Sequence, residues 1–459
     1  MKHARTLAAI LAAALLAGCA ATQAPVSSLP AVSTPPAASA PAPSEPAGPT
    51  VQADWSKLLG NDSAIQPDVD AGRWYEDYTD HLIPSPDYGE LVPYAGANVY
   101  SFNIWTDQNG QEQTWSSNYP SPLYGLMTRE GKIVTDPVYM HAGQLDFYWQ
   151  GESILLPVLS LSRASEEWMD FNNGQRWAIA ALDGSWCTDF EFWMSTCRET
   201  ELLLIGPAGL TWMDPVSAAR VDWDWEFLGI DEEDLSRITE EIMWLFGFQW
   251  THKGVFLGTI YGEDGKGTGQ VRLFDPETLA VSLISMEEWD AILNEWWNLR
   301  STGQKGWDST VEGASVTLSR GEESYTLTTP RPINSLGWHV VGGYAVLSDY
   351  SDRSGEQHAW LFRLSDRALL LEGRDISLGN AVGSRSELAF IQVRHEYGTF
   401  TIYRPDLSVL LELSPRPYVS WPNVTMQNGL LTVRDEQTFS CYDGQTGRVI
   451  FHRNLDMGD

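Results

Sequence analysis

The stretch that decides the fold class is Tyr124–Tyr139, which reads YGLMTREGKIVTDPVY in a chain of 459 residues. An apolar run ends in the polar segment Thr128–Lys132, and a second apolar step leads into Asp136 and Pro137. Two apolar runs that flank a short turn containing glycine are typical of a β-hairpin. The stretch therefore predicts a strand, a tight turn and a second extended arm.

Variants of this unit recur towards the C-terminus. Three similar stretches begin at Trp360, Phe400 and Phe439, which are 40 and 39 residues apart. Each has large apolar residues, then a polar turn with an aspartate, then an aliphatic residue. Related hairpins are predicted at 177–189, 203–215, 271–281 and 316–327, an initial strand at 99–105, and apolar strands upstream of the clearest copies at 254–260, 343–347, 387–393 and 429–433.

A repeat of about 40 residues made of short strands has the spacing of a β-propeller blade. The composition agrees, because 39 Gly, 25 Pro and 21 Trp favour short strands and many turns. We predict an all-β, propeller-like repeat domain of six to eight blades over residues 90–459, with a lead-in segment at 53–89. The alternative is a β-sandwich, or two β domains, whose hairpins are alike by chance.

Two stretches depart from the β pattern and predict short helical inserts. Residues 231–246 carry aliphatic side chains on one helical face and acidic ones on the other. Residues 285–300 open with Ser285 and Glu288 in capping-box spacing. They then place three tryptophans in one apolar sector, and these are the candidates for stacking on a ligand: Trp289, Trp296 and Trp297. The alternative for both inserts is packing on the propeller rim.

The N-terminus has the pattern of an export signal. Residues 1–18 combine a basic start with an apolar run too short to span a bilayer. The run ends in Leu16-Ala17-Gly18-Cys19, which resembles the lipobox of bacterial lipoproteins. The resemblance implies cleavage before Cys19 and lipidation of its thiol, and the alternative is an ordinary signal peptide with a chance cysteine.

The segment 19–52 is almost entirely Ala, Pro, Ser and Thr, a composition that buries no core. We expect a disordered tether that holds the domain away from a bilayer reached through acylated Cys19. The expected location is extracytoplasmic and lipid-anchored. Ala20 permits sorting to an outer membrane where the host has one. A formal net charge of −32 argues against nucleic acid as a partner.

The remaining candidate sites are few. Cys187 and Cys197 are candidates for a disulfide that closes a short loop, and the alternative is a pair of buried free thiols. The cysteines and histidines lack the spacing of a zinc site, and the acidic loop 349–355 lacks the ligand spacing of an EF-hand. Asp222 and Asp224 are read as strand or turn residues. We expect no cofactor, no metal site and no catalytic residue.

The stretch 124–139 also resembles a WG-repeat unit, with Tyr124 in place of the usual Trp. The matching residues are Gly125, Gly131, Lys132, Ile133, Val134, Pro137 and Tyr139. The later copies keep the hairpin rhythm and lose this signature. The resemblance implies an interaction module, so the expected function is binding or scaffolding of an envelope protein. The alternative is a surface protein that binds or cleaves glycans through exposed tryptophans and acidic residues.

Overall fold

The computed structural model divides the chain into two units, Met1–Gly48 and Pro49–Asp459. The residues that the structure describes all belong to the second unit. They are 52–53, 82, 85–106, 111–149, 152–164, 175–235, 249–262, 266–301, 306–350, 357–380, 387–395, 399–413, 422–435 and 438–455. The predicted signal peptide (1–18), Cys19, nearly all of the tether and most of the lead-in segment lie outside them.

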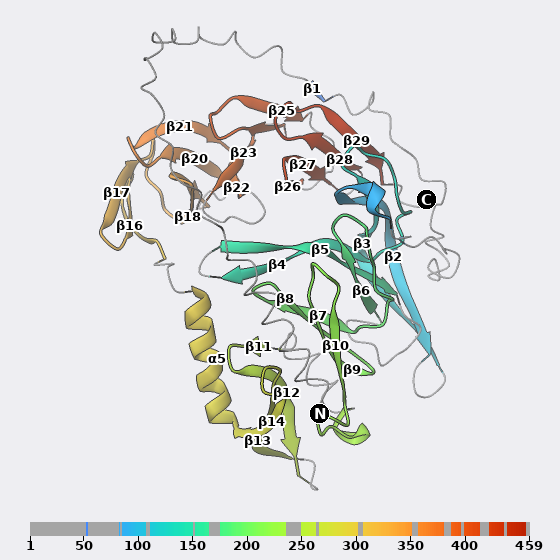
Figure 1. Ribbon diagram of the computed structural model, residues 1–459. Coiled ribbons are helices and arrows are strands. Elements are labelled where there is room, and N and C mark those ends of the chain that lie inside the picture. The colour runs from blue at the N-terminus through green and yellow to red at the C-terminus, as the bar shows by residue number, and fades with distance from the viewer. Residues whose placement is uncertain are drawn as a thin grey trace, which may run out of the picture. The chain divides into compact units, whose positions relative to one another are not determined.

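The described residues form eight small sheets that follow one another along the chain (Figure 1). The first four sheets contain β2 (Leu91–Thr106) and β3 (Glu112–Thr128); β4 (His141–Trp149), β5 (Glu152–Ala164) and β6 (Gln175–Ala181); β7 (Met194–Arg198), β8 (Glu201–Gly206), β9 (Gly209–Met213) and β10 (Arg220–Asp224); and β11 (Trp250–Thr251), β12 (Gly254–Tyr261), β13 (Gly267–Asp275) and β14 (Ala280–Ser285).

The last four sheets contain β15 (Asp308–Glu312), β16 (Ser315–Arg320) and β17 (Glu323–Thr328); β18 (Leu336–Val341), β19 (Tyr344–Asp349), β20 (His358–Arg363) and β21 (Ala368–Gly373); β22 (Asp375–Asn380), β23 (Leu388–Arg394), β24 (Phe400–Tyr403) and β25 (Val409–Leu413); and β26 (Asn423–Gln427), β27 (Leu430–Arg434), β28 (Thr438–Asp443) and β29 (Val449–Asn454). The short strand β1 (Gln52–Ala53) pairs in parallel with β25.

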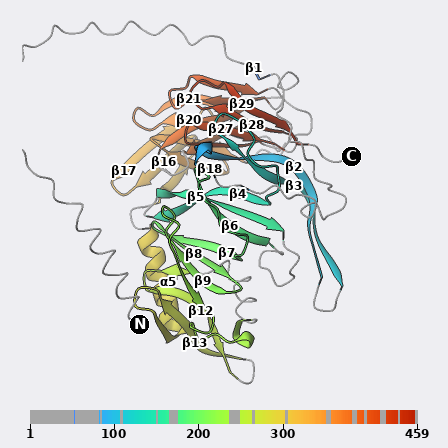
Figure 2. The same ribbon diagram turned by 45° about the vertical axis from the view of Figure 1, so that its right-hand side comes forward.

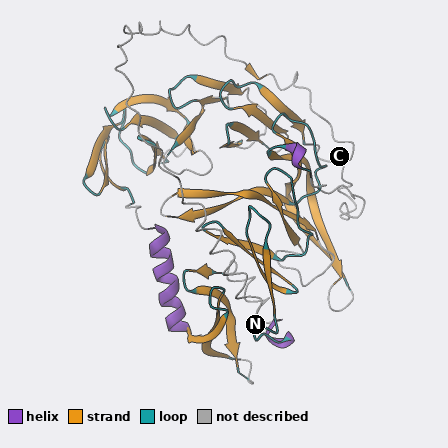
Figure 3. Ribbon diagram, in the orientation of Figure 1, coloured by secondary structure: helices purple, strands orange, loops and turns teal. Residues whose placement is uncertain are grey.

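Apart from the parallel strand β1, seven of the sheets are antiparallel meanders of three or four strands, in which strands that are consecutive in sequence are neighbours in space, and the first sheet is a two-stranded hairpin. Strands dominate the described residues, as the secondary-structure colouring makes plain (Figure 3). Separate meanders that recur along the chain are the construction of a propeller, whereas a sandwich would require two large sheets. The fold is therefore all-β and propeller-like, which confirms the predicted class.

The clearest repeats identified in the sequence correspond to the last two strands of the fourth, sixth, seventh and eighth sheets. The copies that begin at Trp360, Phe400 and Phe439 match the hairpins β20–β21, β24–β25 and β28–β29. The copy at 271–281 matches β13–β14 in the same way. The upstream apolar strands are β12, β19, β23 and β27.

The turns of these hairpins share one chemical device, an aspartate whose carboxylate accepts hydrogen bonds from the turn that follows. Asp443 accepts from the backbone N–H of Thr446 at 2.7 Å and from its hydroxyl at 2.8 Å. Asp275 accepts similarly from residues two and three positions further on, and Asp406 accepts from the N–H and the hydroxyl of Ser408. Hydrogen bonds from the backbone and hydroxyl of Thr446 lower the pKa of Asp443. The recurring aspartate thus specifies the turn.

The stretch 124–139 forms the predicted hairpin, with one difference. The N–H of Thr128 donates to the carbonyl of Lys132 at 2.8 Å, and isolated bridges join Met127 to Ile133 and Tyr124 to Tyr139. The second arm is therefore a series of bridges, because the pairing is interrupted around Pro137, which has no N–H to donate.

Neighbouring sheets are held together by buried apolar clusters, and one of these joins the two ends of the domain. In this contact, which we call the closing seam, Val92 and Tyr94 of the first sheet pack against Phe439 and Phe451 of the eighth. The rings of Tyr94 and Phe451 lie 5.0 Å apart. The turn at Gly131 also meets the eighth sheet, since an added Cβ there would lie 2.7 Å from the carbonyl oxygen of Ile450.

A second contact, which we call the aromatic seam, joins the third and fourth sheets. It is filled by large rings, including Trp193, Trp223, Trp225, Trp250 and Phe274. By contrast, β2 and β3 form a long two-stranded ribbon that both views display (Figure 2). The initial strand predicted at 99–105 lies within β2.

The helical inserts are confirmed in one case. Helix α5 (Met286–Ser301) opens with the predicted capping box, in which Ser285 Oγ accepts from the N–H of Glu288 at 3.1 Å and the Ser285 N–H donates to that carboxylate at 2.8 Å. In the other insert residues 232–235 are helical and capped by Asp231, whereas 236–246 lie outside the described residues.

Candidate functional site

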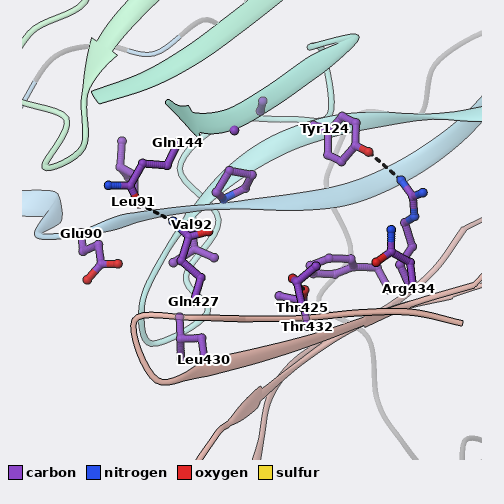
Figure 4. A pocket seen from close by; sticks show the side chains of 15 residues that line it. Glu90, Leu91, Val92, Tyr124, Gln144, Thr425, Gln427, Leu430, Thr432 and Arg434 are labelled. Carbon is purple, nitrogen blue, oxygen red and sulfur yellow. Dashed lines mark hydrogen bonds between the residues drawn. The ribbon is translucent and has the colours of Figure 1, made fainter. Parts of the chain in front are cut away.

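A pocket of about 240 Å³ lies where the closing seam meets the second sheet (Figure 4). Its walls come from β2, β3 and β4 on one side and from β26, β27 and β28 on the other. The strands β2, β4 and β26 are each the first strand of their sheet. The small residues Ala142 and Gly143 in β4 help to leave the space unfilled.

Arg434 is the principal charged group on the eighth-sheet side of the pocket. It ends β27, a strand in which Leu431 and Val433 are buried while Thr432 and Arg434 are half-buried. This alternation sends the aliphatic side chains into the core and the polar ones to the pocket. The guanidinium Nη1 donates to the hydroxyl of Tyr124 at 2.6 Å, so the first residue of the hairpin at 124–139 lines the pocket.

Threonine and glutamine side chains supply further polar groups. Thr425 and Thr432 lie opposite each other on β26 and β27, and their hydroxyls are hydrogen-bonded at 2.6 Å. The amide of Gln427 donates to the side-chain oxygen of Gln144, whose own amide donates to the carbonyl of Leu156 at 2.7 Å. These hydrogen bonds fix the orientation of both side-chain amides in the pocket, with Gln144 on the second sheet and Gln427 on the eighth.

A carboxylate stands at the other end of the pocket, and Figure 4 shows Glu90 and Arg434 towards opposite ends. Glu90 accepts from Arg129 at 2.9 Å and from the side-chain amide of Asn428 at 2.6 Å. Arg129 also donates to the backbone carbonyl of Asn428. Glu90 is therefore satisfied by protein partners, and these contacts tie the first sheet to the turn between β26 and β27.

Apolar side chains form the remainder of the lining, namely Leu91, Val92, Pro93, Leu430 and Phe439. The pocket thus combines one arginine, the paired carboxylate of Glu90, several neutral hydrogen-bonding groups and an apolar wall. An arrangement of that kind suits a small polar group carried on an apolar body. Within the described part of the chain, no group of three or more His, Cys, Asp or Glu is placed to hold a metal ion.

The tryptophans predicted as a stacking surface are divided by the structure. Trp289 packs face to face on Phe256, with ring centroids 5.1 Å apart, and Trp296 packs against Phe147 and Trp149. Both are 5% exposed, whereas Trp297 is 50% exposed. Trp289 and Trp296 are therefore not placed to stack on a ligand, because both pack in the core, and Trp297 stays a candidate.

The two cysteines considered for a disulfide are free thiols in different places. Cys187 packs against the cluster of the first and second sheets, and Cys197 against the cluster of the second and third. Burial raises the pKa of each thiol to about 12. The structure therefore contains the alternative of free thiols, although both side chains are half-buried.

The acidic residues weighed in the sequence have structural partners. Asp222 accepts from Thr211 at 2.6 Å and pairs with Arg220, and Asp224 accepts from the N–H of Phe227 at 2.7 Å. Asp349 is buried and accepts from the N–H groups of Asn334 and Ser335. The loop 351–355 lies outside the described residues.

Neither a protein-family model nor a curated protein sequence matches the chain. Among solved structures it is similar to a eukaryotic initiation factor at 8% identity and a TM-score of 0.30, covering 72% of this chain and 93% of that one. BamB from Moraxella catarrhalis is similar at 11% identity and a TM-score of 0.22, covering 69% of this chain and 92% of that one. Hsv2 of Kluyveromyces lactis is similar at 8% identity and a TM-score of 0.22, covering 69% of this chain and 98% of that one.

These TM-scores are below 0.5, so the similarities carry no argument about function. The propeller-like class rests on the eight small sheets that follow one another along the chain itself. None of the helices in the described residues is long and apolar enough to cross a membrane.

Proposed function

We propose that the protein is an extracytoplasmic lipoprotein that binds a protein partner at the cell envelope and does no chemistry on it. The observation that carries this proposal is the succession of parts in the sequence: a signal-like segment, Leu16-Ala17-Gly18-Cys19, a long Ala/Pro/Ser-rich spacer and then the propeller-like domain. Acyl chains on Cys19 would supply the membrane affinity, at about 0.8 kcal/mol for each buried CH₂ group.

Fractionation of cells tests the anchor. The native chain should sediment with membranes, and Cys19→Ala should leave the membrane fraction, because it lacks the thiol that receives the lipid. Cys197→Ala is the matched control, since its thiol lies in the folded domain and accepts no acyl group in this proposal. Retention of Cys19→Ala in the membrane fraction would refute the anchor.

Within the Trp-rich segment 285–300, we propose Trp297 as the docking residue. Trp297 is half-exposed on α5, and the guanidinium of Arg300 lies 5.0 Å from the centre of its ring. Deleting the whole helix would remove Trp289 and Trp296 from the core, so a point change is the appropriate test.

Crosslinking in intact cells provides that test. Trp297→Ala should reduce crosslinking to envelope proteins, whereas Trp338→Ala, which removes a 37% exposed ring from the sixth sheet, should not. Equal crosslinking by both variants would remove α5 from the binding surface. A glycan array with the same variants tests the alternative, because sugar binding that depends on Trp297 would favour a glycan ligand.

A further inference from the structure

We infer that the pocket at the closing seam binds a carboxylate adjoining an amide and an aliphatic side chain, which is the chemistry of a peptide C-terminus. The inference depends on the proposed binding function in one respect, because the C-terminus would belong to the protein partner. The carboxylate would lie on Arg434, the amide would face the glutamine side chains, and the aliphatic group would contact the apolar wall.

The charge of Arg434 is the first reason. Six other arginines each meet a carboxylate within 3.3 Å, namely Arg129, Arg198, Arg220, Arg272, Arg320 and Arg363. Arg434 instead has the neutral hydroxyl of Tyr124 as the side-chain partner that the described residues give it. The planar guanidinium pairs with carboxylates through two parallel hydrogen bonds, and its other nitrogen atoms remain for such a pair.

The second reason is the supply of donors around that position. Tyr124 accepts from Arg434, so the proton of its own hydroxyl is directed elsewhere. Thr425 and Thr432 share one hydrogen bond, which uses one of their two hydroxyl protons. The side-chain amide of Gln427 donates one N–H to Gln144 and has a second N–H that can donate to a ligand. A carboxylate accepts several hydrogen bonds and satisfies donors of this kind.

The third reason is the polarity of the pocket along its length. Glu90 at the other end is paired with Arg129 and Asn428, so its negative charge is compensated. Leu91, Val92, Leu430 and Phe439 provide an apolar wall. At about 240 Å³ the space is smaller than the roughly 300–1,000 Å³ typical of pockets for drug-sized ligands, which suits one terminal residue.

The test compares two peptides that differ in one group. A hexapeptide ending in Ala-Leu is prepared as the free acid and as the C-terminal amide, and each is titrated calorimetrically into the purified chain carrying Cys19→Ala. The acid should bind at least about tenfold more tightly, because a hydrogen-bonded ion pair is lost with the amide. N-acetyl-leucine, a third ligand, separates a free acylated amino acid from a longer chain end.

Variants assign the binding to the pocket. Arg434→Met should reduce affinity for the acid at least about tenfold and bring it to that of the amide. Arg448→Met removes the same charge from an exposed position between β28 and β29 of the same sheet and should leave affinity unchanged. Tyr124→Phe keeps the ring, removes the hydroxyl and should weaken binding by a smaller factor. Circular dichroism checks that each variant is folded.

Equal binding of acid and amide, binding of neither, or loss of binding equally in Arg448→Met would overturn the inference. Preference for the acid that disappears in Arg434→Met would support it, and the tighter of the hexapeptide and N-acetyl-leucine would identify the source of the carboxylate. These outcomes are independent of Cys19, so failure of the anchor and failure of the pocket are distinguishable.

Discussion

The closing seam and the aromatic seam both join neighbouring sheets of the propeller-like domain, but they are built from different side chains. In the aromatic seam the rings of Trp223 and Phe274 meet edge to face with centroids 4.9 Å apart, and Trp193 and Trp225 stack nearby. The closing seam has a comparable contact between Tyr94 and Phe451, but beside it the sheets diverge around a pocket.

This difference in packing indicates where the fold has room for a ligand. Indole and phenyl rings supply enough volume to fill the space between twisted sheets. Ala142, Gly143 and the threonines of β26 and β27 do not, so the space beside the closing seam remains open and is partly lined by polar groups. We expect the aromatic seam to contribute mainly stability and the closing seam to contribute recognition.

The largest expected effect comes from emptying the aromatic seam. Phe274→Ala should lower the free energy of unfolding by about 3–5 kcal/mol, because it removes a fully buried ring and leaves a cavity. Urea denaturation measures this value. Phe227→Ala is the control, since that ring is 50% exposed and touches Phe274 only at its edge, and it should cost less than about 1.5 kcal/mol. Similar losses in both variants would contradict the special role of the seam.

A smaller effect is expected where the hairpin at 124–139 reaches the eighth sheet. Gly131 has φ of +87°, and an added Cβ would lie 2.7 Å from the carbonyl oxygen of Ile450. Gly131→Ala should therefore cost about 2–4 kcal/mol from backbone strain and overpacking together. Gly313 shares the positive φ but has open space around it, so Gly313→Ala isolates the strain. Thermal unfolding of both variants measures the contribution of the contact as their difference.

The pocket side chains should matter less for stability than for binding. Arg434→Met removes one hydrogen bond and no ion pair to the described residues, so it should cost less than about 1.5 kcal/mol in urea denaturation. A decrease of 3 kcal/mol or more in the free energy of unfolding would show that Arg434 compensates a buried charge of the protein, which would contradict a role in ligand binding.

The smallest effect concerns pH and lies outside both seams. Hydrogen bonds from Thr446 lower the pKa of Asp443. The folded state is therefore stabilised above the unfolded-state pKa near ~3.9, and this contribution disappears as pH falls through the lower folded-state value. Asp443→Ala should be less stable at pH 7 by under about 1 kcal/mol, because the exposed carboxylate is screened by solvent.

The measurement that checks this is the stability difference between the native chain and Asp443→Ala from pH 7 to pH 2. The two curves should converge below pH ~4. A difference that stays constant over the whole range would assign the effect to the side chain's volume and not to its charge.

Local patterns predicted the local elements of this fold. Turn residues and apolar alternation located the hairpins at 177–189, 203–215, 271–281 and 316–327, and spacing identified the repeating unit. The capping box at Ser285 and Glu288 located the start of α5 to within a residue. Such features depend on neighbours along the chain, which is why a sequence specifies them.

The pocket could not be predicted in this way, because its walls are joined by contacts between residues about 300 positions apart. Arg434 and Tyr124, for example, are 310 residues apart. The one available signal was the alternation of Leu431, Thr432, Val433 and Arg434, which indicates a strand with a polar face. Nothing in that pattern indicates what the face meets.

The tryptophans show a related limit of periodicity. Consecutive helical positions are separated by about 100°. Trp296 and Trp297 therefore share a broad apolar sector in a helical projection and still differ in exposure. Contacts with Phe147 and Trp149 on β4, far away in sequence, determine which ring is buried.

The most direct test of recognition at the closing seam is a crystal structure of the chain with the hexapeptide acid ending in Ala-Leu. We predict the terminal carboxylate on the guanidinium of Arg434, near the hydroxyls of Tyr124 and Thr432, with the leucine side chain against Leu430 and Phe439. A peptide bound at another surface, with the pocket unoccupied, would contradict the assignment of this seam as the binding site.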